Sequence, residues 1–133
     1  MKKIEHIGIA VTDINKSNAI FSKIFGKGNH KSEIVESEGV ITSFFQIGEC
    51  KIELVSATNL ESPISKYLQK NREGMHHISF EVEDIVREMA RLKAEGIRLL
   101  NDTPKKGADN KIICFLHPKD TNGVLIEICQ EVT

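Results

Sequence analysis

A histidine and a glutamate recur in both halves of the chain at nearly equal spacing. His6 begins the segment HIGIAVTDI and His77 begins HISFEVEDI, which repeats His, Ile, Val, Asp and Ile at the same places. Glu53 follows His6 by 47 residues, and Glu127 follows His77 by 50. This recurrence indicates an internal duplication in which each copy carries the same two polar residues.

Strand periodicity places all four of these residues on one kind of face. In HIGIAV, bulky residues alternate with His6 and the small residues that share its face, as expected for a half-buried strand. Glu53 and Glu127 stand in the segments IEL and IEI, where the apolar neighbours again point the other way. The histidines and glutamates are therefore predicted to face inward from strands that are otherwise apolar.

Inward carboxylates need a compensating positive charge. Burying a carboxylate is costly unless it is paired or metal-bound, and two carboxylates near each other repel. A divalent cation removes both problems, so we predict a metal site formed by His6, Glu53, His77 and Glu127. His and carboxylate ligands suit Co, Mn, Ni, Fe or Zn, and an octahedral ion would keep two positions for water or substrate.

Other residue types that could do chemistry are placed outside this site. His76 shares the face of the bulky residues, and His30 lies in a polar loop without a spacing partner. Cys50, Cys114 and Cys129 lie in apolar strand patterns without CxxC spacing. We expect these cysteines to be buried, reduced thiols rather than disulfide or zinc ligands.

Composition excludes several classes of partner. The chain has 133 residues, of which 40% are hydrophobic and 28% charged, and its formal net charge is −1. These values are ordinary for one soluble globular domain and predict binding to neither nucleic acid nor membranes. No apolar run reaches transmembrane length and no signal peptide is visible, so a cytoplasmic location is expected.

The first half reads as a strand, a helix and further strands. Asp13 is a predicted N-cap and Gly26 a predicted helix end. The helical stripe between them consists of Ile14, Ile20, Phe21, Ile24 and Phe25. Strands are predicted at 4–12, 39–47 and 50–56, with a polar stretch over 27–38.

A short helix starting at Ser62-Pro63 and ending near Gly74 leads to the second half. There the strand 77–83 precedes a helix with the stripe Ile85, Met89, Ala90 and Leu92, followed by an extended piece at 97–101 and strands at 111–117 and 123–130. We predict an α+β fold in a single domain, 1–133. Two tandem βαβββ modules, about 1–60 and 75–133, are expected to form a curved sheet around a metal-containing cleft.

A duplicated βαβββ module with inward His and Glu resembles the vicinal-oxygen-chelate superfamily, which includes glyoxalase I, extradiol dioxygenases and resistance proteins. Within it the chain is most similar to the methylmalonyl-CoA epimerases. The stretches that carry this similarity are HIGIAV, SPISKYLQKNREGMHHISFEVEDI and KIICFLHPKDTNGVLIEI. The resemblance covers essentially the whole chain.

The resemblance implies an activity and roles for particular residues. It implies metal-dependent epimerisation at C2 of methylmalonyl-CoA through an enolate, with His6, Glu53, His77 and Glu127 at the ligand positions and Glu127 also as an acid/base group. Thr42 stands where one relative has a second acid/base Glu, and Glu81 is a weak substitute for it.

The implied partner is an acyl-CoA. Its phosphates could meet the lysines near the predicted cavity mouth, which are Lys105, Lys106, Lys111 and Lys119. The outer sheet edges could pair in a homodimer.

Three other functions are open to this sequence. Glyoxalase I shares the ligand set and the enolate chemistry, and some epimerases have Gln where this chain has Glu53. An extradiol dioxygenase fits less well, because it uses two His and one carboxylate on iron. A non-catalytic protein that sequesters a small molecule would have no need of four metal ligands.

Overall fold

The computed structural model describes residues 1–133, which fall into two compact units. Residues 7–76 form one, called here the N-terminal unit, and residues 1–6 with 77–133 form the other, the C-terminal unit. The boundaries fall inside the repeated strands, β1 (Lys3–Ala10) and β5 (Gly74–Glu81), so each of these strands contributes residues to both units.

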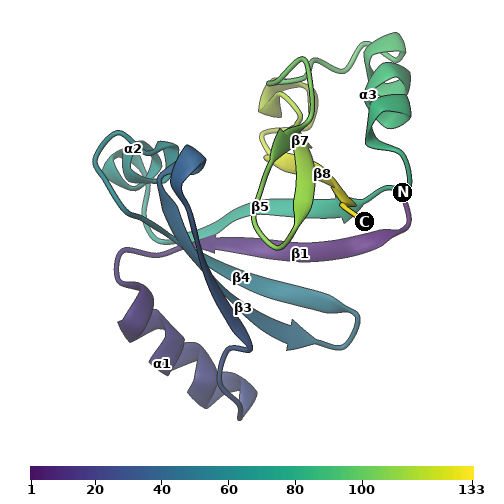
Figure 1. Cartoon of the computed structure of the whole chain (residues 1–133). Helices are drawn as coiled ribbons and strands as arrows, with labels where there is room; N and C mark the ends of the chain where they lie inside the picture. Colours follow the sequence, from purple (N-terminus) through teal and green to yellow (C-terminus); the bar gives the residue numbers. More distant parts are fainter. The chain divides into compact units, whose positions relative to one another are not determined.

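The N-terminal unit is built on three antiparallel strands in the order β2-β3-β4. They are β2 (Lys31–Val35), β3 (Val40–Ile47) and β4 (Cys50–Ala57), with a short 3₁₀ helix, η1 (Glu36–Glu38), between the first two. The helix α1 (Ile14–Phe25) packs against β3 and β4 (Figure 1). The core consists of Val11, Phe45 and Leu54 together with Ile9, Ile14, Phe21, Phe25 and Ile52.

The helix signals read from the sequence are confirmed at both ends of α1. The Asp13 side chain accepts a hydrogen bond from the Lys16 backbone N–H at 3.0 Å, and Gly26 ends the helix with φ 71°. Two members of the predicted stripe were wrong, since Ile20 and Ile24 are 48% and 65% exposed. Each lies one residue, or about 100° of helical turn, before the buried-face residues Phe21 and Phe25.

Helix α2 (Pro63–Lys70) follows β4 and starts as predicted, with the Ser62 hydroxyl accepting from the Ile64 backbone N–H at 3.2 Å. It ends at Lys70, four residues before the predicted Gly74. The polar stretch 27–38 contains β2, which the sequence did not predict as a strand. This strand is paired on one side only, and Lys31, Ser32, Glu33 and Ile34 are partly or fully exposed, so its apolar signal is weak.

The C-terminal unit combines helix α3 (Ile85–Ala94) with strands in the order β5-β8-β7-β6. The further strands are β6 (Lys105–Lys106), β7 (Lys111–Phe115) and β8 (Ile126–Glu131), and η2 (Pro118–Asp120) is a 3₁₀ helix. The pair β5–β8 is parallel, whereas β8–β7 and β7–β6 are antiparallel. The chain order in both halves, β1-α1-β2-β3-β4 and β5-α3-β6-β7-β8, confirms the α+β fold of two βαβββ modules.

The core of this unit lies between α3 and one face of its strands. It consists of Val82, Ile85, Met89, Leu92, Cys114, Leu116 and Ile128. The predicted stripe of α3 is confirmed at three positions and wrong at Ala90, which is exposed. None of the α-helices α1, α2 and α3 has the length and apolar character that a membrane-spanning helix needs.

Candidate metal centre

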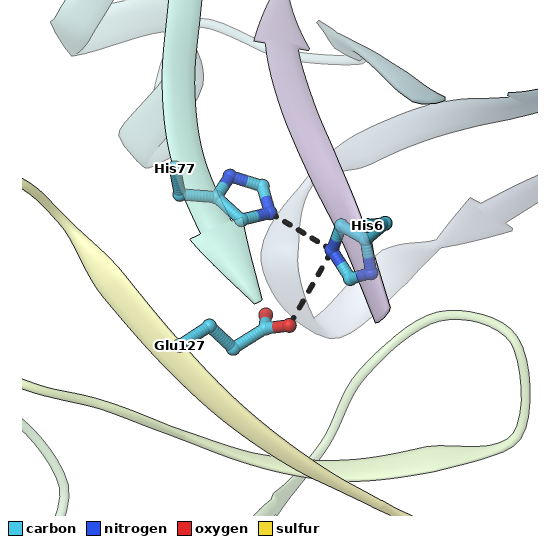
Figure 2. Close-up of side chains that lie close together, drawn as sticks. All are labelled: His6, His77 and Glu127. Carbon is cyan, nitrogen blue, oxygen red and sulfur yellow. Dashed lines mark hydrogen bonds and ion pairs between the residues drawn. The ribbon is translucent and has the colours of Figure 1, made fainter. Parts of the chain in front are cut away.

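Three buried side chains converge in the C-terminal unit. They are His6 of β1, His77 of β5 and Glu127 of β8, whose ligand atoms all lie within 4.8 Å of one another. His6 Nε2 lies 3.1 Å from His77 Nε2 and 3.4 Å from Glu127 Oε2, and the three side chains point toward one another (Figure 2). Residues 71 and 50 positions apart thus meet at one point.

Strand alternation explains why Glu127 points toward the histidines. Its neighbours Ile126 and Ile128 belong to the core under α3, so Glu127 faces the opposite side of the sheet. Across the parallel pair β5–β8, Glu127 lies beside Ser79. Ser79 follows His77 by two residues, so both point to the same face of β5. The prediction that this glutamate faces away from the helical core is confirmed.

Glu5 orients the His6 ring and was not identified from the sequence. Its carboxylate Oε1 lies 3.1 Å from His6 Nδ1, and Glu5 is only 2% exposed. Because an ionised carboxylate only accepts hydrogen bonds, Nδ1 carries the proton of a neutral His6 and the lone pair is on Nε2. A carboxylate partner on the second ring nitrogen is typical of metal-ligating histidines. The only sequence signal for it was its position directly before His6.

The electrostatics of this cluster favour a cation. Glu127 Oε2 is buried and accepts no hydrogen bond, while two buried carboxylates, those of Glu5 and Glu127, flank one imidazole. Either a second proton on His6 or a metal ion can balance them. Two imidazole nitrogens and a carboxylate oxygen are a donor set suited to Zn, Fe, Mn, Co or Ni. The residues present therefore fit a divalent metal ion.

Packing holds the second histidine in place. The His77 ring contacts the Phe115 ring edge to face, with centroids 5.9 Å apart and an interplanar angle of 85°. The His6 and His77 rings are also perpendicular, with centroids 5.2 Å apart. His76, which the sequence analysis placed outside the site, instead packs its ring on Tyr67 at 4.8 Å.

Glu53 and Thr42 belong to the N-terminal unit. Glu53 is 5% exposed on β4, opposite Phe44 of β3, and its neighbours Ile52 and Leu54 lie in the core as predicted. Its place in the ligand set stays a prediction. Thr42 is 2% exposed, and its hydroxyl donates to the Glu33 backbone carbonyl at 3.3 Å.

Glu81, the weak substitute for a second base, is held by another charge. Its Oε2 lies 3.6 Å from Lys2 Nζ, and it lies beside Cys129 in the parallel pair.

The cysteines form no disulfide. Cys114 and Cys129 are buried as predicted, whereas Cys50 is half-buried. Burial raises the pKa of the Cys129 thiol to about 12, with the nearby Glu127 and Glu5 adding to the effect and the Ser79 hydroxyl opposing it. Cys129 is therefore a neutral thiol at neutral pH.

The four lysines suggested for an anionic ligand differ in their settings. Lys111 is 5% exposed, with its Nζ 4.0 Å from Asp109 Oδ2, which is not the setting expected of a residue at a cavity mouth. Lys105 Nζ lies 5.5 Å from the centroid of the Phe115 ring, which in turn contacts His77. Lys106 and Lys119 are exposed.

Comparison with known proteins identifies the family of this chain. Residues 5–115 match the family model of the Glyoxalase/Bleomycin resistance protein/Dioxygenase superfamily. The mitochondrial methylmalonyl-CoA epimerase of Homo sapiens is 40% identical over 129 residues, covering 96% of this chain and 73% of that protein. The ethylmalonyl-CoA/methylmalonyl-CoA epimerase of Cereibacter sphaeroides is 39% identical over 130 residues, covering 96% and 97%.

A solved structure gives the same result for the fold. It is that of a variant of Streptomyces coelicolor methylmalonyl-CoA epimerase in complex with 2-nitronate-propionyl-CoA, which superposes with a TM-score of 0.95 at 33% identity and covers 100% of this chain and 96% of that chain. The chain therefore belongs to the Glyoxalase/Bleomycin resistance protein/Dioxygenase superfamily and, within it, to the methylmalonyl-CoA epimerase family.

Proposed function

We propose that this protein is a metal-dependent epimerase that interconverts the two C2 epimers of methylmalonyl-CoA. The observation that carries the proposal is the buried cluster of His6, His77 and Glu127 in a chain of this family. His6 and His77 would hold a divalent ion through Nε2, and Glu127 would hold it through a carboxylate oxygen. Co, Mn, Ni, Fe and Zn all suit these ligands.

The reaction needs a base and stabilisation of negative charge. The proton at C2 is flanked by a thioester and a carboxylate, so its removal leaves an electron pair that is delocalised onto the thioester oxygen as an enolate. A bound divalent ion supplies positive charge that stabilises such an oxygen. Return of a proton to the other face of the planar C2 centre gives the other epimer.

Glu127 is the acid/base group that we assign. A carboxylate has two oxygens, so Glu127 has the chemistry both for a metal contact and for accepting the C2 proton. Thr42 is a poor candidate for a second base because a hydroxyl is barely acidic and this one donates to a backbone carbonyl. Glu81 is engaged by Lys2.

Glu53 is proposed as the fourth ligand on the strength of the sequence repeat. It occupies in the first βαβββ module the place that Glu127 occupies in the second, and it is a buried carboxylate in a strand whose neighbours are core residues. A homodimer and a cytoplasmic location are likewise proposed from the sequence alone.

Lys105 is the cation proposed to attract the negative charges of an acyl-CoA, because it is exposed and its Nζ lies 5.5 Å from the centroid of the Phe115 ring. Lys111 shares the strand face of Phe115, but it is buried beside Asp109 and is not assigned this role. Phe115 contacts His77, so this face of β7 is the face of the candidate metal centre.

Glyoxalase I is the second candidate, and one residue favours it. Some epimerases have Gln where this chain has Glu53, which brings the chain nearer to glyoxalase I at that position. The ligand set does not distinguish the two enzymes, because glyoxalase I shares both these ligands and the enolate chemistry. The same protein preparation should therefore be assayed with methylmalonyl-CoA and with the hemithioacetal of glutathione and methylglyoxal.

The decisive experiment is exchange of the C2 proton of methylmalonyl-CoA in D₂O, followed by NMR with added Co²⁺ or Mn²⁺ and with a chelator. We expect rapid exchange with metal and loss of exchange after chelation. His77→Ala should remove most bound metal and most exchange, whereas His30→Ala, which changes an exposed histidine, should change neither. Turnover of the hemithioacetal without C2 exchange would favour glyoxalase I, and stoichiometric metal in His77→Ala would contradict the ligand assignment.

A further inference from the structure

Two buried side-chain oxygens lack a hydrogen-bond partner, and they lie on neighbouring strands. They are Ser79 Oγ and Glu127 Oε2. Ser79 is 0% exposed and Glu127 is 5% exposed, so bulk water does not satisfy either of them. Buried polar groups are nearly always paired, so each such exception calls for an explanation.

The strand register places these two residues side by side. In the parallel pair β5–β8, Ser79 is the direct partner of Glu127. Strands in a sheet lie about 4.8 Å apart, and partners across a parallel pair point to the same face. His77 is two residues before Ser79 and shares that face, so the serine lies next to the candidate metal centre.

The chemistry of the two groups is complementary. A hydroxyl can donate one hydrogen bond and its proton rotates freely, whereas an ionised carboxylate can only accept. Hydrogen bonds to a charged acceptor are also roughly twice as strong as neutral ones. The Ser79 hydroxyl is therefore a suitable donor for an otherwise unsatisfied carboxylate.

We propose that Ser79 is a positioning residue for Glu127, whose hydroxyl donates to the Glu127 carboxylate when a divalent ion is bound by His6, His77 and Glu127. This inference rests on the proposed metal site and adds a residue to it. The hydrogen bond would be accepted by the Glu127 carboxylate and would fix its orientation toward the two imidazole nitrogens. Glu5 has the equivalent relation to His6, through Nδ1.

Cys129 is the alternative partner of Ser79. It lies two residues after Glu127 on β8. The Ser79 hydroxyl is close enough to lower the pKa of the Cys129 thiol by hydrogen bonding. A thiol sulfur is a weak acceptor, so it competes poorly with a carboxylate. Replacing Cys129 therefore separates the two explanations.

The test measures Co²⁺ binding by calorimetry and urea unfolding of the full chain without metal. Ser79→Ala should weaken Co²⁺ binding about 10-fold, the lower end for loss of a residue that supports a ligand. Without metal it should change the urea midpoint little, because the only neighbouring partner of the hydroxyl is the Cys129 thiol, whose sulfur is a weak acceptor. Ser79→Thr keeps the hydroxyl and should bind Co²⁺ within about threefold of the parent, which guards against a folding failure of the alanine variant.

Two controls complete the design. Ser43→Ala removes another 0% exposed strand serine, whose hydroxyl donates to Asn18 Oδ1 at 2.5 Å in the N-terminal unit. This variant should lower the urea midpoint and leave Co²⁺ affinity unchanged. Cys129→Ala should also leave Co²⁺ affinity unchanged.

Each remaining outcome overturns a defined part of the argument. Parental Co²⁺ affinity in Ser79→Ala would end the role of Ser79 while leaving the metal site intact. Weakened binding in Cys129→Ala equal to that in Ser79→Ala would assign the effect to the thiol. Failure of the parent itself to bind Co²⁺ would overturn the metal site of the proposed function and, with it, this inference.

Discussion

At the scale of single residues, the candidate site depends on which atom of each side chain is available. Glu5 holds Nδ1 of His6, which leaves Nε2 directed at His77 and Glu127. Glu127 is an acceptor without a donor. We propose that this ligand set holds a divalent cation and that the Glu127 carboxylate also moves the C2 proton. These two roles of Glu127 can be separated by substitution.

Glu127→Gln should keep part of the metal affinity, because an amide oxygen can still coordinate an ion. It should lose proton transfer, because an amide has no useful basicity near neutral pH. General acid–base groups contribute about 10²–10⁴-fold, so C2 exchange measured at saturating Co²⁺ should fall by at least 10². Glu81→Gln is the matched control, since Glu81 is a half-buried glutamate on a neighbouring strand, and should exchange at the parental rate. Parental exchange by the metal-loaded Glu127→Gln variant would remove its proton-transfer role.

At the scale of elements, a charged clamp fixes the connection that leads into β8. Arg98, after α3, donates to the Asp120 carboxylate of η2 from its backbone N–H, Nε and Nη2 at 2.9, 3.0 and 2.9 Å. The His117 backbone N–H also donates to the Arg98 carbonyl at 2.8 Å. Because β8 carries Glu127, the clamp helps define where that strand begins.

The clamp predicts a particular dependence of stability on pH. The Arg98 hydrogen bonds hold the pKa of the Asp120 carboxyl far below its usual range. A lowered folded pKa means that the stabilisation is complete above the unfolded pKa of about 3.9 and is lost as pH falls toward the folded value. The urea midpoints of the parent and Asp120→Asn should therefore differ most at pH 7, less at pH 3 and least at pH 2.

The control for this clamp is Asp102→Asn, which changes an exposed carboxylate four residues after Arg98, between α3 and β6. It should leave the urea midpoint at pH 7 unchanged. A difference between the parent and Asp120→Asn that grew as pH fell would mean that the ionised Asp120 destabilises the fold.

At the scale of the whole molecule, the chain is a duplicated βαβββ module. The repeated strands β1 and β5 each begin their module, and each carries a buried histidine. The glutamate of the first module, Glu53, lies in the N-terminal unit, and the glutamate of the second, Glu127, lies in the C-terminal unit. The sequence repeat predicts that Glu53, like Glu127, is a metal ligand.

Substitution of Glu53 tests whether this glutamate is a metal ligand. Glu53→Ala should weaken Co²⁺ binding strongly, because it removes an oxygen ligand, whereas Glu53→Gln should retain most binding and turnover, because some relatives carry Gln at this position. Calorimetric titration with Co²⁺ measures both. Glu49→Ala, at an exposed turn before β4, is the control and should bind as the parent does. Unchanged affinity in Glu53→Ala would restrict the ligand set to the cluster of His6, His77 and Glu127.

The sequence by itself determined the features that repeat or that are coded locally. The recurrence of His and Glu identified the candidate ligands, and strand alternation predicted which way Glu53 and Glu127 face. The caps at Asp13 and Ser62 marked helix starts, because a cap depends only on residues within one turn. These signals can be recognised without the fold, because each depends on the order of residues along the chain and not on tertiary contacts.

Tertiary structure alone decided which side chains meet. Strand pairing brings His6 to His77 and sets Ser79 beside Glu127, and no local pattern encodes a distance between residues 71 positions apart. It also decided that Glu5 is buried against His6 and that Ile24 is exposed, because burial depends on what packs against a residue. The residue types of the site could thus be predicted from the sequence, whereas its geometry comes from the order and register of the strands.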